Sequence, residues 1–399
     1  MNYFPQILSL IFTGSISFLL SLFIAREVGP TNFGEYSIAI SLGAVFLILF
    51  DGGFRTLILR ERTKDRALQS CIHNELPNIA SAHSIVVLIL ISVLFVFFFP
   101  KKIHFYLGII LCFWSIAINQ YASSILRGDG LLKVDAIFLF KQRIFTAFFI
   151  SSAILLGFIQ TYQILLAWAL GSILSNLLLK EGFRSPPSFN HLLSHAPGLY
   201  RPLFALMCID LATVIYFRSD IVMLQAFNIV DNEIGQYAAA YRLIEAPILL
   251  FSPISIIFFR KILFLQSTIG LQRKFIYKSI LLSGIFSLIG VILFGLFAEQ
   301  LVFYAYGSEY SYASSLLPLL GWMIVLCIPN SLLTQAALAL SLERDYAKTA
   351  LVAAIANISL NFIFIPDHGI LACAYNSIAT EIILLIGLIF IINRKLNRE

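Results

Sequence analysis

The sequence has little charge and no long polar stretch. Only 12% of its 399 residues are Asp, Glu, Lys or Arg, whereas 59% are hydrophobic and the mean hydropathy is +0.91. A water-soluble protein of this length needs far more polar surface than these residues supply. The composition therefore excludes a sizeable soluble domain and predicts an integral membrane protein.

Cysteine is scarce, and the common site motifs are absent. The five cysteines lie far apart without a Cys-x-x-Cys pair, so we expect small, buried, reduced thiols. His191 and His195 have the i,i+4 spacing of a metal pair, but they have no third ligand and lie in a linker segment. No group of residues forms a phosphate-binding loop or a catalytic triad. We therefore expect no catalytic residue, no metal and no other cofactor.

Long apolar runs take up most of the chain. A hydrocarbon core of about 30 Å is crossed by about 20 helical residues. On this measure the sequence predicts twelve spans: 4–25, 36–59, 79–99, 104–126, 138–158, 162–181, 202–227, 234–258, 277–299, 312–340, 346–365 and 370–392. The alternating ten-residue strands of a membrane barrel are absent. The expected fold class is an all-α integral membrane protein with twelve transmembrane helices.

The basic residues are distributed unevenly between the two sides of the predicted spans. Most of the 27 Lys and Arg residues lie in or beside the connections after the even-numbered spans and at the C-terminus. The opposite side carries Arg26, Lys101 and Lys102. This bias predicts that both termini are cytoplasmic. Contact with anionic lipid head groups accounts for the net charge of +6, so no nucleic-acid partner is expected.

A polar segment rich in proline, RSPPSFNHLLSHAP, divides the spans six and six. Such composition is typical of a connection between helical bundles. We predict an N-terminal six-helix bundle over 1–183, a cytoplasmic linker over 184–201 and a C-terminal six-helix bundle over 202–399. Two such halves are typical of transporters that work by alternating access.

A short internal repeat supports this division. FGEYSIA (33–39) resembles IGQYAAA (234–240), and each stands at the start of an even-numbered span that ends in a basic cluster. Both copies run in the same direction, which predicts a parallel repeat. The connections on the side opposite the basic clusters are short, which counts against a catalytic domain there.

Charged residues inside spans are rare and tend to face a cavity or one another. Asp51 and Arg55 stand four apart in DGGFR, a spacing that fits a salt bridge on one helical face. Arg55 could also extend its side chain to the nearby membrane surface. The glycines between them favour close packing or a local bend.

The seventh and eighth spans hold the other charges. Arg218 and Asp220 lie on different helical faces, so at least one group among them and Asp210 needs a partner on another helix. Hydration near the outer membrane surface is the alternative for Asp220. Arg242 and Glu245 are three apart within GQYAAAYRLIEAP and can form a bridge. That pair is either a structural link between helices or part of a cavity.

Several segments resemble polysaccharide flippases of the Wzx or O-antigen transporter type. They are AREVGPTNFGEYSIAISLGAVFLILFDGGFRTLILRER, then FRSDIVML, IGQYAAAYRLIE and YGSEYSYASSLLPLL, in the family's order. The resemblance implies a fold similar to the multidrug and toxin extrusion transporters, within the multidrug/oligosaccharidyl-lipid/polysaccharide exporter superfamily. It implies a cargo of oligosaccharide on undecaprenyl diphosphate, moved across the bacterial inner membrane.

The resemblance also implies a cationic cavity, whose substrate-binding residues here would be Arg242, Arg218, Arg55 and Arg26. Arginine suits this role because its planar fork holds phosphate oxygens. Charge balance or ion coupling would fall to Glu245, Asp51, Asp210 and Asp220. The expected partners are the lipid-linked oligosaccharide, membrane lipids, and a polysaccharide polymerase with its chain-length regulator. The alternatives are an ion-coupled drug or metabolite exporter of the same fold and a membrane polysaccharide polymerase.

Overall fold

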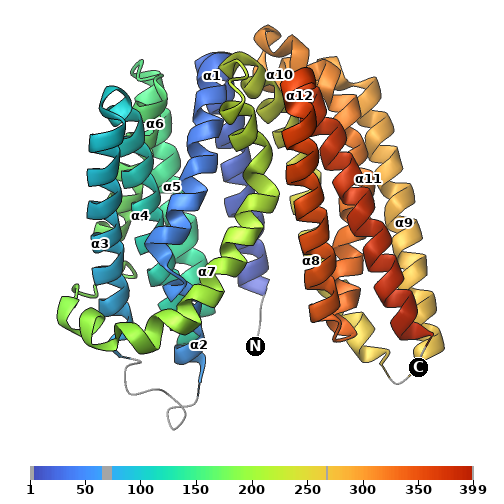
Figure 1. Ribbon diagram of the computed structural model, residues 1–399, viewed down its shortest axis with the longest axis horizontal. Helices are drawn as coiled ribbons and strands as arrows, with labels where there is room; N and C mark the ends of the chain where they lie inside the picture. Colours follow the sequence, from blue (N-terminus) through green and yellow to red (C-terminus); the bar gives the residue numbers. More distant parts are fainter. Residues whose placement is uncertain (1–3, 65–73, 267, 398–399) are drawn as a thin grey trace. The chain divides into compact units, whose positions relative to one another are not determined.

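The computed structural model describes residues 4–64, 74–266 and 268–397, and helices dominate it (Figure 1). No β-strand occurs in these ranges. The α-helices are α1 (Phe4–Asp51), α2 (Phe54–Thr63), α3 (Leu76–Phe98), α4 (Ile103–Gly128), α5 (Leu132–Leu155), α6 (Thr161–Leu178), α7 (Phe189–Ala226), α8 (Asp231–Phe264), α9 (Ile269–Leu296), α10 (Ala298–Tyr306), α11 (Ser311–Ala339) and α12 (Glu343–Leu396). Eleven of the twelve predicted spans fall on one helix each to within a few residues, whereas the span 36–59 is divided between α1 and α2. The all-α membrane fold is confirmed.

Helices α1 and α12 each carry two of the predicted spans. A helix of 54 residues, the length of α12, is about 81 Å long, more than twice the hydrocarbon thickness. Both helices change direction at a glycine with positive φ, Gly29 (φ 75°) in α1 and Gly369 (φ 55°) in α12. Pro30 follows Gly29 directly and cannot donate the backbone hydrogen bond of a continuous helix.

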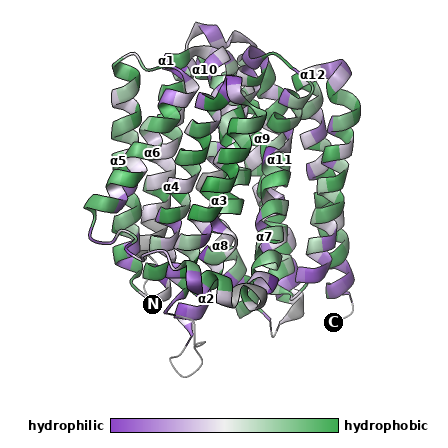
Figure 2. Ribbon diagram, turned by 60° about the vertical axis from the view of Figure 1, so that its left-hand side comes forward, coloured by the Kyte–Doolittle hydropathy of each residue, from purple (hydrophilic) through white to green (hydrophobic). Residues whose placement is uncertain are grey.

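Length and composition make most of these helices suitable for crossing a membrane. Within the described ranges, eight helices meet both requirements, or nine if the bent α7 counts as one span. Apolar residues cover their length, and hydrophilic residues gather toward their ends, as at the C-terminal end of α12 (Figure 2). Arg394 and Lys395 occupy that end. The chain is a multi-pass membrane protein.

The helices form two compact units. Unit 1 consists of the described residues up to Val28 together with Glu35–Arg218, and unit 2 consists of Gly29–Gly34 and the described residues from Ser219 onward. In unit 1, α4 packs against α2, α3, α5 and α6. In unit 2, α11 packs against α8, α9 and α12. Each unit therefore has a central helix surrounded by others.

The segment predicted as a linker, 184–201, belongs to unit 1. Its second part is the start of α7, which begins at Phe189. Leu192 and Leu199 are buried in the apolar core of unit 1, while the residues on either side of them are exposed. These two leucines are seven apart, about two helical turns, and so share one face. The polar composition of the segment reflects its other face.

A short piece of α1 packs closely on α8 inside unit 2. A Cβ atom on Gly235 would lie 1.9 Å from the carbonyl oxygen of Pro30, and one on Gly34 would lie 1.9 Å from that of Asp231. The contact is reciprocal, and Gly34 and Gly235 are the matching positions of the predicted repeat. Only glycine allows two backbones to approach in this way. The two copies of the repeat therefore contact each other.

Candidate functional site

The first charged cluster forms where α1 ends and α2 begins. Gly52 (φ 56°) and Gly53 (φ 82°) adopt backbone conformations that other residues rarely take, and the chain turns there. The Asp51 carboxylate accepts hydrogen bonds from the backbone N–H groups of Gly53 (3.1 Å) and Arg55 (2.9 Å). Asp51 therefore satisfies N–H groups that would lack partners at the start of α2.

The carbonyl groups at the end of α1 also find partners on neighbouring helices. Tyr121 of α4 donates its hydroxyl to the Phe50 carbonyl at 2.8 Å, and Nε2 of His83 on α3 lies 3.0 Å from the Leu49 carbonyl. Because a carbonyl only accepts, Nε2 carries the hydrogen in this contact. The break in the helix is thus held by side chains from two other helices.

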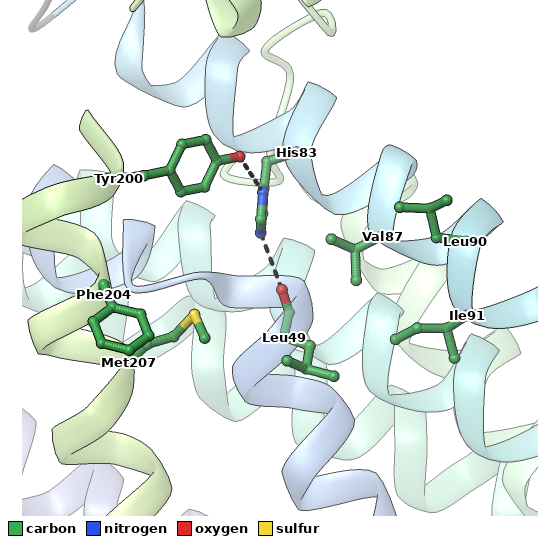
Figure 3. Close-up of a pocket in the computed structure, with 8 residues that line it drawn as sticks. All are labelled: Leu49, His83, Val87, Leu90, Ile91, Tyr200, Phe204 and Met207. Carbon is green, nitrogen blue, oxygen red and sulfur yellow. Dashed lines mark hydrogen bonds between the residues drawn. The ribbon is translucent and has the colours of Figure 1, made fainter. Parts of the chain in front are cut away.

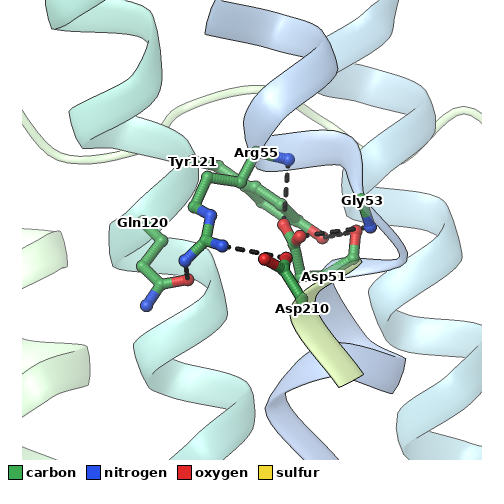
Figure 4. Close-up of polar contacts among 6 residues, drawn as sticks. All are labelled: Asp51, Gly53, Arg55, Gln120, Tyr121 and Asp210. Atoms are coloured by element: carbon green, nitrogen blue, oxygen red, sulfur yellow. Dashed lines mark hydrogen bonds and ion pairs between the residues drawn. The ribbon is translucent and has the colours of Figure 1, made fainter. Parts of the chain in front are cut away.

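Arg55 pairs with an acid from another helix (Figure 4). Its guanidinium lies 2.9 Å from the Asp210 carboxylate of α7 and donates to the Gln120 amide oxygen of α4 at 3.3 Å. The side chains of Arg55 and Asp210 are 36% and 29% exposed. The pair is therefore accessible to an incoming group and not sealed inside the unit.

This geometry corrects the predicted pairing of Asp51 with Arg55. The predicted span 36–59 is broken at the two glycines, so the two residues do not share one continuous helical face. The Asp51 carboxylate binds backbone N–H groups instead, and the Arg55 guanidinium binds Asp210. The expectation that a charge of the seventh span needs a partner on another helix is confirmed for Asp210.

The second charged pair is in unit 2. Arg242 and Glu245 on α8 form an ion pair at 2.6 Å, with side chains that are 30% and 25% exposed. The bridge allowed by the i,i+3 spacing is present. Nearby, Tyr237 and Tyr241 pack together with ring centroids 5.9 Å apart. The ion pair is thus partly exposed and shares α8 with two packed tyrosine rings.

A third cluster surrounds Asp220 at the C-terminal part of α7. Its carboxylate accepts hydrogen bonds from Asn361 (2.7 Å), Ser377 (2.9 Å) and Tyr237 (3.0 Å). These donors come from α12 and α8 and are all uncharged. Among the described contacts of Asp220 there is no Lys or Arg. Helical neighbours therefore bind Asp220, whereas the alternative interpretation was hydration near the membrane surface.

Two of the predicted arginines lie outside these clusters. Arg26 is exposed on α1, three residues before the break at Gly29. Arg218 is half-buried and is the last residue of unit 1. Within unit 1 the structure brings together Asp51, Arg55 and Asp210, and within unit 2 it pairs Arg242 with Glu245.

Several polar residues inside the spans make buried contacts that were not predicted from the sequence. One is Glu381, a buried acid within the predicted span 370–392, which accepts a hydrogen bond from Asn330 at 2.7 Å. The others bind Asp220 or one another on α12: Asn357, Asn361, Asn376, Ser377 and Thr380. Glu381 was visible as a charge inside an apolar run. Asn357 and Asn361 were visible as two amides four residues apart on one helical face.

The comparisons with known proteins agree with this architecture. Residues 2–259, more than half of the chain, match the model of a family described as polysaccharide biosynthesis protein. The chain belongs to this family. A search of curated proteins finds no match.

The fold of this chain is similar to that of two kinds of solved transporter. Lipid II flippase MurJ, in an inward closed conformation, matches with a TM-score of 0.78 and 15% identity over 98% of this chain and 88% of that one. An inward-facing multidrug resistance MATE transporter of the MOP superfamily matches with a TM-score of 0.68 and 13% identity over 97% and 96%.

The solved structures bear out the predicted fold, and the family match together with this fold bears out the predicted superfamily. At such low identities the solved structures show the fold alone. Family and fold together are those of transporters and flippases, which confirms the prediction of a transport protein rather than an enzyme. The alternative of a membrane polysaccharide polymerase has no support from them.

Proposed function

We propose that this protein is a flippase that moves an oligosaccharide linked to undecaprenyl diphosphate, such as an O-antigen repeat unit, from the cytoplasmic to the periplasmic leaflet of a bacterial inner membrane. The family description supports a role in polysaccharide biosynthesis, and MurJ is a flippase of lipid II. In this proposal both termini are cytoplasmic, as the distribution of Lys and Arg favours. The product would pass to a polymerase with its chain-length regulator in lipopolysaccharide biosynthesis.

The accessible pair of Arg55 and Asp210 is the observation that carries the proposal. A diphosphate cannot cross lipid unless its charge is compensated. The Arg55 guanidinium has one neutral and one acidic partner and is partly exposed, so it can exchange the carboxylate for phosphate oxygens. Asp210 then balances the arginine when no cargo is bound.

Arg242, Arg218 and Arg26 are also proposed to bind the anionic cargo during alternating access. Arg242 already has a carboxylate partner in Glu245, with the arrangement found for Arg55. Asp51 and Glu245 are proposed to maintain the charge balance. None of these roles requires covalent chemistry.

Deleting the gene in its own host tests the function. The flippase hypothesis predicts that surface polysaccharide is lost while complete single repeat units accumulate on the inner leaflet, measured by mass spectrometry of extracted lipids and by accessibility to an external glycosidase. Single units on the outer leaflet of the deletion strain would contradict the proposal. Wild-type levels of surface polysaccharide would contradict it as well.

The MATE similarity favours a second candidate, an ion-coupled exporter of drugs or metabolites. The accessible arginines favour an anionic cargo for either function. Export of a panel of cationic and anionic dyes from cells distinguishes the two. A deletion strain that becomes sensitive to drugs but keeps its surface polysaccharide would support the exporter.

Replacing Arg242 with alanine is expected to block export while the protein still inserts and accumulates. Loss of a charged hydrogen-bond donor to the cargo slows transport about tenfold or more, since each tenfold corresponds to about 1.4 kcal/mol. The measurement is surface polysaccharide normalised to protein level. Arg273→Ala, which removes an exposed arginine on α9, is the control and should export normally. Normal export by the Arg242 variant would exclude Arg242 as a cargo contact.

Asp220 is proposed to couple transport to a proton or sodium gradient. A carboxylate bound only by uncharged donors can accept a cation without breaking an ion pair, unlike the carboxylates of Asp210 and Glu245. Asp220→Asn should bind cargo normally but lose stimulation by either gradient in proteoliposomes. Asp345→Asn, at an exposed acid of α12, is the control. Unchanged stimulation of the Asp220 variant would remove Asp220 from the coupling mechanism.

A further inference from the structure

A separate cavity lies in unit 1 between α1, α3 and α7 (Figure 3). Its volume is about 350 Å³, within the size range of about 300–1,000 Å³ that is typical of ligand pockets. The lining residues are Leu49, His83, Val87, Leu90, Ile91, Tyr200, Phe204 and Met207. Side chains from all three helices surround the open space in the figure. We call it the α1–α3–α7 pocket.

The two polar members of the lining are bound to other protein groups. Nδ1 of His83 lies 2.8 Å from the Tyr200 hydroxyl, and Nε2 lies 3.0 Å from the Leu49 carbonyl. Since both ring nitrogens have partners, only the carbon atoms of the His83 ring are available to a ligand in the pocket. The remaining lining side chains are aliphatic, aromatic or thioether. The pocket therefore fits a hydrocarbon ligand and offers little to a polar one.

The pocket opens at the surface of a membrane-spanning unit. Leu90 and Phe204 are 57% and 64% exposed, whereas Ile91 is buried at 8%. The exposed side chains at the opening are apolar, so a hydrocarbon chain meets no polar barrier there.

The pocket lies next to the charged cluster of the same unit. On α1, Leu49 is two residues before Asp51. On α7, Met207 is three residues before Asp210, a rise of about 4.5 Å. Asp210 holds Arg55 at 2.9 Å. An apolar cavity and an accessible guanidinium thus lie about one helical turn apart.

We propose that the α1–α3–α7 pocket binds the part of the cargo's polyprenyl chain closest to its phosphate, while Arg55 binds the phosphate. The juxtaposition of a hydrocarbon cavity with an exchangeable cation matches a long apolar chain joined directly to an anionic group. Chain burial and charge pairing then act on the same molecule, so binding in the pocket positions the headgroup. This inference rests on the proposed function, since it names how the lipid part of that cargo is held.

Photolabelling of the full-length protein in nanodiscs of phosphatidylethanolamine and phosphatidylglycerol tests this inference. The first probe is a polyprenyl phosphate with a diazirine near the phosphate end of its chain, and the second is a phosphatidylglycerol with a diazirine in its acyl chain. We expect the first probe to label α3 and α7 at the pocket, as mapped by mass spectrometry. Unlabelled polyprenyl phosphate should compete, whereas excess phosphatidylglycerol should not.

Filling the pocket provides a matched comparison. Val87→Trp should weaken binding of the first probe about tenfold, or about 1.4 kcal/mol. Leu90→Trp, at a more exposed lining position that tolerates a larger side chain, should weaken it in the same direction. Val93→Trp, on the same helix but outside the pocket and 47% exposed, should leave labelling unchanged.

Three results would overturn the inference. They are equal labelling by the phosphatidylglycerol probe, labelling by the first probe only at helices other than α1, α3 and α7, and labelling that neither pocket tryptophan reduces in folded protein. Photolabelling requires no transport, so the two proposals fail separately. Labelling at the pocket in a protein whose deletion traps no lipid-linked units would leave the pocket and remove the flippase. Trapped lipid-linked units without labelling at the pocket would support the flippase and exclude the pocket as the binding site of the chain.

Discussion

Replacing Gly235 with alanine is expected to destabilise the protein strongly. The new Cβ atom would lie 1.9 Å from the Pro30 carbonyl oxygen and 3.0 Å from the Gly34 backbone nitrogen. Backbone atoms cannot rotate away as a side chain does, so α1 and α8 must separate at this contact. Overpacking costs about 1–3 kcal/mol and occasionally more, and a clash with backbone belongs at the upper end. The measurement is the midpoint of thermal unfolding in detergent.

A matched glycine on α9 is the control. Nothing lies within 4 Å of a Cβ atom at Gly290, so Gly290→Ala should raise the midpoint slightly, because alanine favours a helix over glycine by about 1 kcal/mol. Gly34→Ala should act like Gly235→Ala, because the contact is reciprocal. The double variant should cost less than the sum, because the first methyl group already separates the helices. A Gly235 variant with the wild-type midpoint would contradict the contact.

Replacing Arg55 with glutamine is expected to weaken cargo binding, whereas Asp210→Asn should preserve or strengthen it. Hydrogen bonds to a charged group contribute about 1.5–3 kcal/mol, which is about 10- to 150-fold in affinity. The Asp210 carboxylate competes with the cargo phosphate for the Arg55 guanidinium, so removing its charge frees the arginine. The measurement is equilibrium binding of a fluorescent polyprenyl diphosphate to the protein in nanodiscs.

The opposite signs of these two effects separate a binding role from a structural one. If the ion pair only joins α2 to α7, both variants should lose the same interaction and change binding to the same extent. Arg127→Gln is the control, because it breaks another arginine–aspartate pair of unit 1, with Asp135 at 2.8 Å. Equal weakening by the Arg55 and Asp210 variants would assign the pair to folding.

The helical segments follow from the sequence because membrane thickness and hydropathy fix their lengths. This is why eleven of the twelve predicted spans each coincide with one helix. The superfamily was predicted instead from the order of the short motifs along the chain. Helix α10 (Ala298–Tyr306) was not predicted, since it is too short and too close to α9 for a span of its own. The burial of Leu192 and Leu199 was hidden in a segment whose average composition is polar.

The partners of the charged residues depend on contacts between distant segments. The local spacing predicted that Arg55 pairs with Asp51, but two consecutive glycines with positive φ end the helix between them. The true acidic partner, Asp210, is 155 residues away along the chain. Nothing in the sequence around either residue identifies the other. Arg242 and Glu245 could be paired correctly because no such break separates them.

Uncharged polar residues in apolar runs were not predicted to take part in a site, yet two of them donate hydrogen bonds to Asp220 in the structure. Asn357 and Asn361 lower the mean hydropathy of their span only slightly, yet they help to surround Asp220. An amide inside a membrane needs a hydrogen-bond partner as a charge does, although at a lower cost. The spacing of amides along α12 was therefore the signal for this cluster.

The placement of Gly29–Gly34 in unit 2 restricts how the two units can rearrange. The backbone passes between the units after Val28, after Gly34 and after Arg218. Only the six residues Gly29–Gly34 separate the first two of these points. The backbone of Pro30 and Gly34 packs directly against the backbone of α8. While these contacts hold, residues 29–34 stay packed on α8. The backbone just before Gly29 and just after Gly34 must therefore accommodate any change between two states of the protein.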